Sequence, residues 1–273
     1  MEANISSLVQ ACQLDDLPYR FIDTNKNCLL IKDSHFFQLN RTPFNTESMA
    51  ALGRDKEHQY EMLKDQVNMP KTMGFLDYTV GEEYQQYLTH HSLVDIIATI
   101  ESNFSYPLVI KKNRGALGIH VFLCHNRDEV TTAIHTVFDR NSPEYDYVVL
   151  AQQYIKTKLE MRVIFFDGKP VLSYERHFAK VEFGARYWET DEGKALTVDD
   201  NELINQAAER FKPAVTLPGL RFVGLDIIID EQDNFYLIEL NSGPKVKNYI
   251  TSHGDKAVVE MYRKVLAKYF SPA

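Results

Sequence analysis

The sequence predicts an α+β fold rather than a doubly wound parallel sheet. Hairpin signals and helical segments are mixed along the 273-residue chain, without a regular strand–helix–strand alternation. The clearest hairpin is at residues 221–241, where two alternating apolar runs flank the polar segment DEQDN. The length fits one large domain or two small ones, with ample apolar material for a buried core.

The N-terminal part is expected to begin with an amphipathic helix and three short strands, at residues 4–14, 19–23, 28–32 and 36–40. A longer helix is predicted at 46–68, with Asn45 or Thr46 as its cap and Pro70 as its stop. A strand at 72–76 and one or two helices should follow.

In the middle of the chain, residues 106–124 are typical of a strand, a glycine-containing turn and a second strand. Asn126 with Glu129 three positions later resembles a capping box, which predicts a helix to about residue 140. Further strands are predicted at 147–154, 160–166 and 169–178.

Residues 179–198 are charged and aromatic without a clear period, which indicates a mobile loop. Asp199 is expected to cap a helix to about Lys212. After the hairpin, a basic loop should lead into a C-terminal helix from Asp255 to Phe270.

Composition narrows the class of protein. A net charge of −8 argues against a nucleic-acid surface, although a local basic patch can still bind a polyanion. Cys12, Cys28 and Cys124 are widely spaced without a CxxC pair, so we expect neither a zinc cluster nor a disulfide framework. The N-terminus lacks the features of a signal peptide, and no apolar run approaches the ~20 residues that span a bilayer. We therefore expect a cytoplasmic protein with no membrane partner.

The hairpin carries the strongest indication of a site. If its turn centres on Gln232 and Asp233, then Asp226 lies opposite Glu239, at roughly 5 Å between Cβ atoms. Asn241 shares their face because strand side chains alternate. Opposed carboxylates repel unless a hard cation such as Mg²⁺ lies between them. The alternative is an exposed hairpin with ordinary surface acids. The other face is expected to be core: Val223, Leu225, Ile227, Ile229, Ile238 and Leu240.

Three further features are weak evidence for a binding site when each is taken alone. Lys111 ends a strand before a turn with Gly115 and Gly118, which could approach phosphate oxygens or be a plain turn. Lys56 begins a helical stretch and could equally be a solvated side chain. The strand at 148–155 could read an adenine edge or be an ordinary edge strand. Near it in sequence are Glu160, Arg162 and Arg176, which could form structural ion pairs or a phosphate site.

Taken in order, these motifs resemble the ATP-grasp superfamily, in particular the branch of cyanophycin synthetase, glutathione synthetase and ribosomal-protein glutamate ligase. The match covers roughly residues 50 to 250. The motifs that carry it are Asp55-Lys56, Met69-Pro70, Val109-Ile110-Lys111 with Gly115 and Gly118, Gln152-Gln153-Tyr154-Ile155, Glu160-Met161-Arg162, Gly224-Leu225-Asp226 and Glu239-Leu240-Asn241.

The resemblance implies an ATP-grasp fold whose two α+β subdomains clasp ATP. It implies a short N-terminal region at 1–50 and an ATP-grasp domain at 51–273, with a lid subdomain at about 70–150 and a metal-binding subdomain at about 151–273. Part of the substrate site would then be missing, reduced, or supplied by the second subunit of a homodimer.

It also implies roles for single residues. Lys56 and Lys111 would contact ATP phosphates, under a lid formed by Gly115 to Gly118. Backbone at Gln153, Tyr154 and Ile155 would read adenine, and Glu160 would hold the ribose. Mg²⁺ and the transferred phosphate would be held by two groups of side chains: Asp226, Glu239 and Asn241 for the metal, and Arg162 and Arg176 for the γ-phosphate and the substrate carboxylate.

The sequence departs from the family pattern in two places, the glycine turn after Lys111 and the segment after Asn241. Lys112, Ala116 and His120 replace a proline, a serine and a glycine of the lid turn. The segment after Asn241 reads Ser-Gly-Pro-Lys, where the family has x-x-Pro-Gly. The lysines Lys245 and Lys247 in this basic loop could bind a second substrate carboxylate or be solvated.

The activity implied is ATP-dependent ligation of a carboxylate of an amino acid or peptide to an amine, through an acyl phosphate. Phosphorylation would give a poor electrophile a good leaving group, so the protein mainly positions reactants and neutralises charge. Two alternatives stay open: a nucleotide-binding pseudoenzyme or accessory subunit, and an ATP-grasp kinase of a small molecule.

Overall fold

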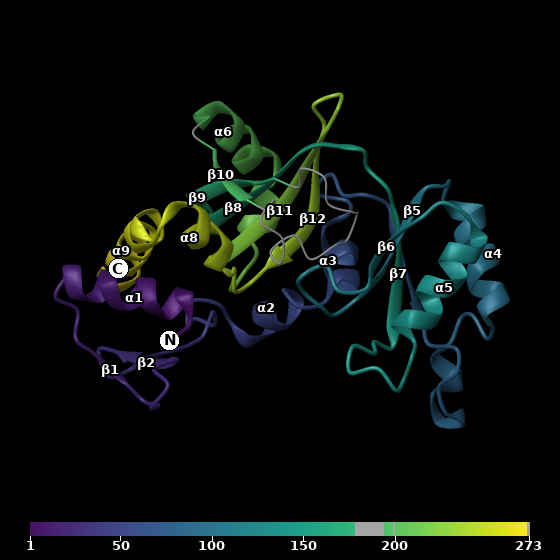
Figure 1. The fold of residues 1–273 in the computed structure, drawn as a ribbon, viewed down its shortest axis with the longest axis horizontal. Coiled ribbons are helices and arrows are strands. Elements are labelled where there is room, and N and C mark those ends of the chain that lie inside the picture. Colours follow the sequence, from purple (N-terminus) through teal and green to yellow (C-terminus); the bar gives the residue numbers. More distant parts are fainter. Residues whose placement is uncertain (178–193, 199, 272–273) are drawn as a thin grey trace.

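The computed structural model describes residues 1–177, 194–198 and 200–271. They form two larger antiparallel sheets and a small third sheet, with helices packed against them (Figure 1). The predicted α+β class is therefore confirmed. Within these ranges, none of the helices has the length and apolar character to cross a bilayer. All three cysteines are free, as expected.

The N-terminal region joins one helix to a three-stranded sheet of order β1-β2-β3. The elements are α1 (Ala3–Leu14), β1 (Tyr19–Phe21), β2 (Cys28–Ile31) and β3 (His35–Gln38). They lie where the sequence predicted a helix and three strands. α1 packs against the C-terminal helix α9 (Lys256–Phe270), and Leu8, Phe37 and Tyr262 lie in the core they share. This region therefore packs against the end of the chain (Figure 1).

The single helix predicted at 46–68 is wrong, because the structure has two short helices, α2 (Glu47–Leu52) and α3 (Lys56–Leu63). Thr46 caps the first, and the Asp55 side chain caps the second by accepting from the N–H of His58. Gly53 lies between them, and Ser242 leaves no room there for a Cβ atom. An aspartate cap competes with continuing helix, so the chain breaks here and restarts at Lys56.

A four-stranded sheet of order β4-β7-β5-β6 forms one side of the molecule. Its strands are β4 (Thr72–Leu76), β5 (Leu108–Lys112), β6 (Val121–Cys124) and β7 (Val148–Gln153). A 3₁₀ turn, η1 (Glu82–Tyr87), precedes α4 (Leu93–Asn103), and α4 and α5 (Arg127–Val137) cover one face of the sheet (Figure 1). As predicted, Asn126 caps α5 by accepting from the N–H of Glu129. The face without helices is left to line a site.

The central sheet has five strands in the order β10-β9-β8-β11-β12. They are β8 (Thr157–Phe166), β9 (Lys169–His177), β10 (Lys194–Thr197), β11 (Phe222–Asp230) and β12 (Phe235–Asn241). Helices near this sheet are α6 (Asn201–Arg210), α7 (Lys212–Val215) and α8 (Lys247–His253). β11 and β12 are the predicted hairpin.

The structure departs from the sequence predictions at three further places. Most of the expected loop 179–198 lies outside the described residues, but its end forms β10, so that part of the prediction is wrong. Asp199 also lies outside them, and the cap of α6 is Asp200. The basic loop before the last helix contains α8, which the sequence did not indicate because a helix of 7 residues, with Tyr249 and Ile250 as its apolar positions, is too short to show a period.

Candidate active site

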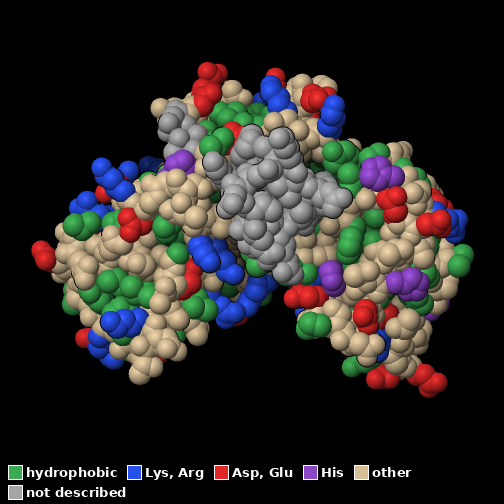
Figure 2. All heavy atoms as spheres, viewed as in Figure 1, with side chains coloured by type: hydrophobic (Ala, Val, Ile, Leu, Met, Phe, Trp, Pro, Cys, Tyr) green, Lys and Arg blue, Asp and Glu red, His purple; other side chains and the backbone are tan. Residues whose placement is uncertain are grey.

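A cleft of about 1820 Å³ lies between the β4-β7-β5-β6 sheet and the central sheet. Every residue that the sequence singled out for a site lines it, from Lys56 through Asn241. Lys and Arg outnumber Asp and Glu along its described lining, although the whole chain carries a charge of −8. Figure 2 shows blue Lys and Arg side chains where the surface is hollowed between the two sides of the molecule. A local positive field of this kind favours an anionic ligand.

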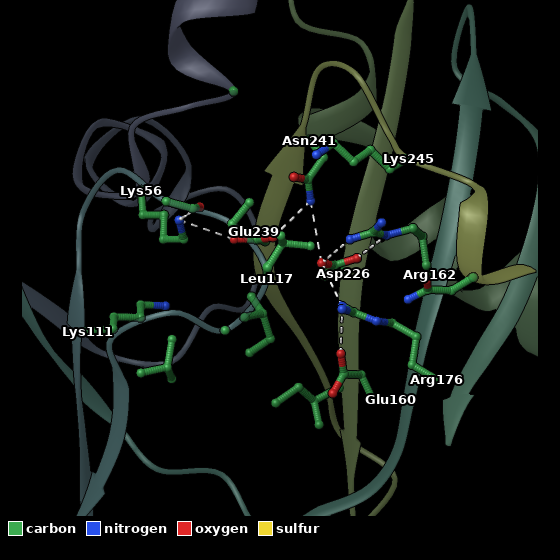
Figure 3. Close-up of a pocket in the computed structure, with 18 of the residues that line it drawn as sticks. Lys56, Lys111, Leu117, Glu160, Arg162, Arg176, Asp226, Glu239, Asn241 and Lys245 are labelled. Carbon is green, nitrogen blue, oxygen red and sulfur yellow. Dashed lines mark hydrogen bonds and ion pairs between the residues drawn. The ribbon is translucent and has the colours of Figure 1, made fainter. Parts of the chain in front are cut away.

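Two carboxylates and an amide meet at one wall of the cleft (Figure 3). Asp226 on β11 pairs with Glu239 on β12, as predicted. The Nδ2 atom of Asn241 lies 3.0 Å from Oε1 of Glu239 and 3.4 Å from Oδ2 of Asp226. Among the described residues, no three His, Cys, Asp or Glu side chains form a metal-ligating group. In the structure the Asn241 amide points its nitrogen toward the carboxylates, and a rotation of the amide by half a turn would present its oxygen instead. Two carboxylates with one amide oxygen fit a hard cation such as Mg²⁺.

The prediction for Ile238 is wrong. The other residues assigned to the core face are buried or nearly so, but Ile238 is partly exposed and lines the cleft. The ladder shifts between Asp226 and Ile227, so that Ile227 pairs with Leu237. Ile238 is thus the extra residue of a β-bulge, and Leu237 takes its place in the core.

Arginines surround Asp226. Arg162 lies opposite it on β8, with Nε and Nη2 at 2.5 and 2.6 Å from its two carboxylate oxygens. Arg176 Nη1 lies 2.9 Å from Asp226 and 2.8 Å from Glu160. Burial acts to raise the pKa of Asp226, but the two arginines outweigh burial and hold that pKa well below its usual value. Protein cations therefore offset the repulsion between the paired carboxylates.

Glu160 is shielded on the same wall. Burial raises the pKa of its carboxyl group to about 7, even though Arg176 opposes the shift. It therefore stands at the border between the protonated and ionised forms at neutral pH.

Two lysines face the carboxylates from the other side (Figure 3). Lys56 Nζ donates to the backbone oxygens of Asn113 and Gly115, at 3.2 and 2.9 Å, and lies 3.5 Å from Oε2 of Glu239. Lys111 is buried, and its Nζ donates to Gln152 Oε1 at 2.9 Å. Burial and the neighbouring charge of Lys56 lower the pKa of Lys111 to about 7. Two amines so placed suit a polyphosphate.

The glycine turn between β5 and β6 is fastened to the start of α3. Asn113 Oδ1 accepts from the N–H of Glu57 at 2.8 Å, and Arg114 Nη2 lies 3.1 Å from Asp55 Oδ2. The first residues of the turn and the first turn of α3 therefore form one unit.

The unusual residues of this turn also have structural partners. Lys112, in place of the family proline, is buried and forms an ion pair with Glu144. Gly115 packs on the Lys112 side chain, which would have to shift to admit a Cβ atom there. Gly118 has φ +67°, and His120, in place of the last family glycine, has φ +53°. The turn thus keeps a left-handed backbone where the sequence has lost a glycine.

The last residue of β7, Gln153, and the following Tyr154 and Ile155 line the far end of the cleft. The N–H of Gln153 already donates to the Lys71 carbonyl at 2.8 Å. An apolar wall, which the sequence did not reveal, completes this end of the cleft: Val109, Val121, Leu123, Ile228 and Ile238. It suits a flat, weakly polar group such as a purine.

Other lining residues were missed because they are distant in sequence. Arg41 precedes the segment Thr42-Pro43-Phe44-Asn45 and lines the same cleft as Lys245 and Lys247. None of these three cations forms an ion pair with a described residue. Asn45 fastens the loop beyond β12, because its Nδ2 donates to the carbonyl of Ser242 at 3.0 Å.

The two clasping sheets with this cleft are those of an ATP-grasp protein. Solved structures that share the fold include a D-alanine–D-alanine ligase from Bacillus anthracis complexed with ATP (TM-score 0.54, 19% identity, 79% of this chain and 64% of that one). Another is VanG D-Ala:D-Ser ligase from Enterococcus faecalis (TM-score 0.60, 18% identity, 80% and 62%). The chain belongs to the RimK-like ATP-grasp domain family, whose family model matches residues 77–265.

Curated relatives are ligases by name. A probable alpha-L-glutamate ligase of Shewanella halifaxensis is 30% identical over 227 residues, which are 81% of this chain and 43% of that protein. The coenzyme gamma-F420-2:alpha-L-glutamate ligase of Methanocaldococcus jannaschii is 26% identical over 209 residues, 73% and 62% of the two chains. A D-alanine–D-alanine ligase of Bacillus anthracis is 32% identical over 109 residues, which are 38% of this chain and 34% of that protein. This chain therefore spans between 34% and 62% of the length of these relatives.

Proposed function

We propose that this protein is an ATP-dependent ligase that joins a carboxylate of an amino acid or peptide to an amine. The observation that carries the proposal is that Lys56, Lys111 and the glycine turn face Asp226, Glu239 and Asn241 across one cleft in a member of the RimK-like ATP-grasp family. Positive charge for a triphosphate and oxygen ligands for Mg²⁺ are thereby presented to the same space.

Each group of residues that lines the cleft has a separate role in binding ATP or Mg²⁺. Lys56 and Lys111 bind phosphate oxygens, and Gly115 to Gly118 close over them. The far end takes the nucleoside: the apolar wall holds adenine beside the backbone of Gln153, Tyr154 and Ile155, and Glu160 accepts from the ribose hydroxyls. Asp226, Glu239 and Asn241 would hold one or two Mg²⁺ ions, which when bound neutralise phosphate charge.

The reaction then needs positioning rather than a nucleophilic side chain. The substrate carboxylate attacks the γ-phosphorus and releases ADP, and the resulting acyl phosphate loses phosphate when the amine attacks its carbonyl carbon. Arg162 and Arg176 stabilise the transferred phosphoryl group and the substrate carboxylate. Both already lie within 3 Å of Asp226, at the centre of the cleft wall.

Three cations without an ion-pair partner among the described residues support an acidic substrate. Arg41, Lys245 and Lys247 line the cleft near Asn241 and make no ion pair with a described residue. Two of the relatives named above are glutamate ligases, whose substrate carries more than one carboxylate. We infer that glutamate or an acidic peptide is preferred to D-alanine, the substrate named for the other relatives.

The domain organisation follows the same proposal. Residues 1–50 form the short N-terminal region and 51–273 the ATP-grasp domain, with 70–150 as lid and 151–273 as metal-binding subdomain. A homodimer would supply any part of the substrate site that one chain lacks, and a molar-mass measurement in solution tests it.

Incubation with ATP, Mg²⁺ and a panel of amino acids and peptides, followed by mass spectrometry, tests the activity. The expected result is ADP release that requires an acidic substrate, together with an amide product. A stable phosphorylated compound without an amide would instead identify a kinase. Nucleotide binding without turnover on any substrate would identify a pseudoenzyme or accessory subunit. Lys245→Glu should raise the KM for the acidic substrate and leave the KM for ATP unchanged.

A further inference from the structure

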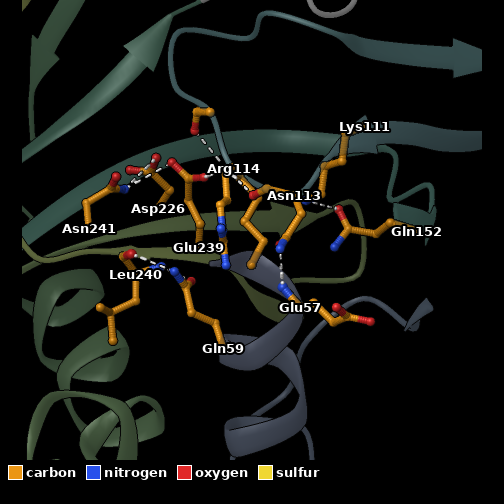
Figure 4. A network of polar contacts seen from close by, with 12 residues as sticks. Glu57, Gln59, Lys111, Asn113, Arg114, Gln152, Asp226, Glu239, Leu240 and Asn241 are labelled. Carbon is orange, nitrogen blue, oxygen red and sulfur yellow. Dashed lines mark hydrogen bonds and ion pairs between the residues drawn. The ribbon is translucent and has the colours of Figure 1, made fainter. Parts of the chain in front are cut away.

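Helix α3 lies against the outer edge of β12, and one of its buried side chains forms hydrogen bonds with the backbone of that strand. Gln59 is 2% exposed and stands one helical turn after Lys56. Its Oε1 accepts from the N–H of Leu240 at 2.8 Å, and its Nε2 donates to the carbonyl of Leu240 at 3.0 Å (Figure 4). The second Nε2 hydrogen goes to the carbonyl of Leu52 at 3.0 Å. The amide thus replaces a neighbouring strand at Leu240.

This contact falls at a sensitive place in β12. Leu240 is the residue between Glu239 and Asn241, and its side chain is buried in the core while theirs face the cleft. In the described sheet, β12 is the last strand, so its outer edge has no strand partner. An unpaired edge is free to twist or slip, and two hydrogen bonds to a packed helix remove that freedom.

A second anchor lies further along the same edge. The N–H of Leu237 donates to the carbonyl of Asn68 at 2.9 Å, and Asn68 Nδ2 donates to the carbonyl of Phe235 at 2.8 Å. The bulge at Ile238 lies between the two anchors. Of these two anchors, only the one at Gln59 is adjacent to Glu239 and Asn241, the β12 residues of the carboxylate cluster.

We propose that Gln59 is a positioning residue for the cation site, a role that rests on the proposed function. By fixing both backbone groups of Leu240, it fixes the directions of the Glu239 and Asn241 side chains relative to Asp226. Residues that orient metal ligands in this way typically change metal affinity about 10- to 100-fold when they are lost. Because Lys56 belongs to the same helix and lies 3.5 Å from Glu239, α3 also aligns the phosphate-binding amine with the cation site.

The test is Mn²⁺ binding in the presence of saturating ADP, with free Mn²⁺ counted by electron paramagnetic resonance. Gln59→Met keeps the side-chain length and removes all three hydrogen bonds. We expect its Mn²⁺ affinity to fall about 10- to 100-fold. The affinity for ADP without metal should stay within about twofold of wild type, and hydrogen exchange at the Leu240 amide should accelerate. Gln59→Asn, which withdraws the amide by one methylene, serves as a second, smaller change and should weaken Mn²⁺ binding too.

Two controls separate positioning from stability. Gln66→Met removes an exposed amide just beyond α3, and Leu63→Val trims a buried side chain of α3 but leaves the hydrogen bonds between Gln59 and Leu240 in place. Both should bind Mn²⁺ like wild type. Equal Mn²⁺ affinity in wild type and both Gln59 variants, or an equal loss in Leu63→Val, would overturn the inference alone. A wild-type protein that binds neither Mn²⁺ nor ADP would overturn the proposed function as well.

Discussion

Arg162 and Asp226 face each other across β8 and β11 and form a two-point ion pair, with N–O distances of 2.5 and 2.6 Å. Arg176 adds a third contact to the same carboxylate. The side chains of Arg162 and Asp226 are 12% and 4% exposed, so this pair is shielded from water. The two arginines keep Asp226 in its ionised form, which is the form that its proposed role as a cation ligand requires.

Asp226→Asn should therefore destabilise the protein, because it removes the carboxylate that pairs with Arg162 and one of the two carboxylates that pair with Arg176. Breaking one side of a buried ion pair costs about 3–5 kcal/mol. Urea unfolding followed by circular dichroism measures this. Asp33→Asn is the matched control, because Asp33 pairs with Arg20 at an exposed site and should cost no more than about 1 kcal/mol.

The same pair predicts a pH dependence. The folded-state pKa of Asp226 is lowered, so its contribution to stability is complete above the ordinary aspartate pKa of about 4 and is lost as the pH falls further. The difference in free energy of unfolding between wild type and Asp226→Asn should shrink as the pH is lowered below about 4. A difference that stays constant down to pH 2 would contradict the ion pair.

Glu239→Gln should abolish most ADP formation, because it removes one of two carboxylates at the proposed cation site. A lost metal ligand removes several kcal/mol of transition-state stabilisation, which is at least about 100-fold in kcat/KM. Glu231→Gln is the control: it neutralises a carboxylate at the tip of the same hairpin, where Glu231 pairs with exposed Lys156. Full ATP turnover by Glu239→Gln would refute the assignment.

The lowered pKa of Lys111 predicts that the protein takes up protons when a nucleotide binds. A pKa of about 7 means that at pH 8 the free protein holds Lys111 mostly neutral, and phosphate oxygens favour the charged form. Calorimetry of ADP binding at pH 8, in buffers with different ionisation enthalpies, should show uptake of a fraction of a proton, and the affinity should fall as the pH rises above about 7. Lys111→Met should bind more weakly and show no uptake; an identical proton signal in this variant would assign the uptake elsewhere.

Arg114→Gln should loosen the glycine turn, because it removes the ion pair between Arg114 and Asp55. Arg114 is half-exposed, but its partner Asp55 is buried and caps the helix that carries Lys56. We expect faster hydrogen exchange at residues 113–118 and about 5- to 10-fold weaker ADP binding, equivalent to roughly 1 kcal/mol. Arg114→Lys should recover part of the affinity. Arg127→Gln, which breaks an exposed pair with Glu101, should change neither property.

Local sequence signals predicted much of the fold. Asn126 with Glu129 predicted a helix start, and the polar segment between two apolar runs placed Asp226 opposite Glu239. Each of these signals depends on neighbours a few residues away. The sequence order of motifs supplied the remaining site candidates, and all of them line one cleft.

Tertiary packing decides what the sequence could not show. The break at Gly53 depends on Ser242, which is distant in the chain, and the exposure of Ile238 depends on a register shift. Arg41 and Lys245 line one cleft only after the N-terminal region packs against the central sheet. Gln59 has no recognisable pattern at all, because its importance comes from the backbone of another element.

The bulge at Ile238 divides the hairpin into two separately aligned halves. On the tip side, Ile227 to Ile229 pair with Phe235 to Leu237 in one register; on the other side, Gly224 to Asp226 pair with Glu239 to Asn241 in another. Each half is clamped on its own, by β8 along one flank and by Asn68 or Gln59 along the other. Insertions at the tip should therefore be tolerated as spacer changes. Deleting Ile238 would join the two halves into one continuous ladder, in which Glu239 still faces the cleft but the local twist of the bulge is lost.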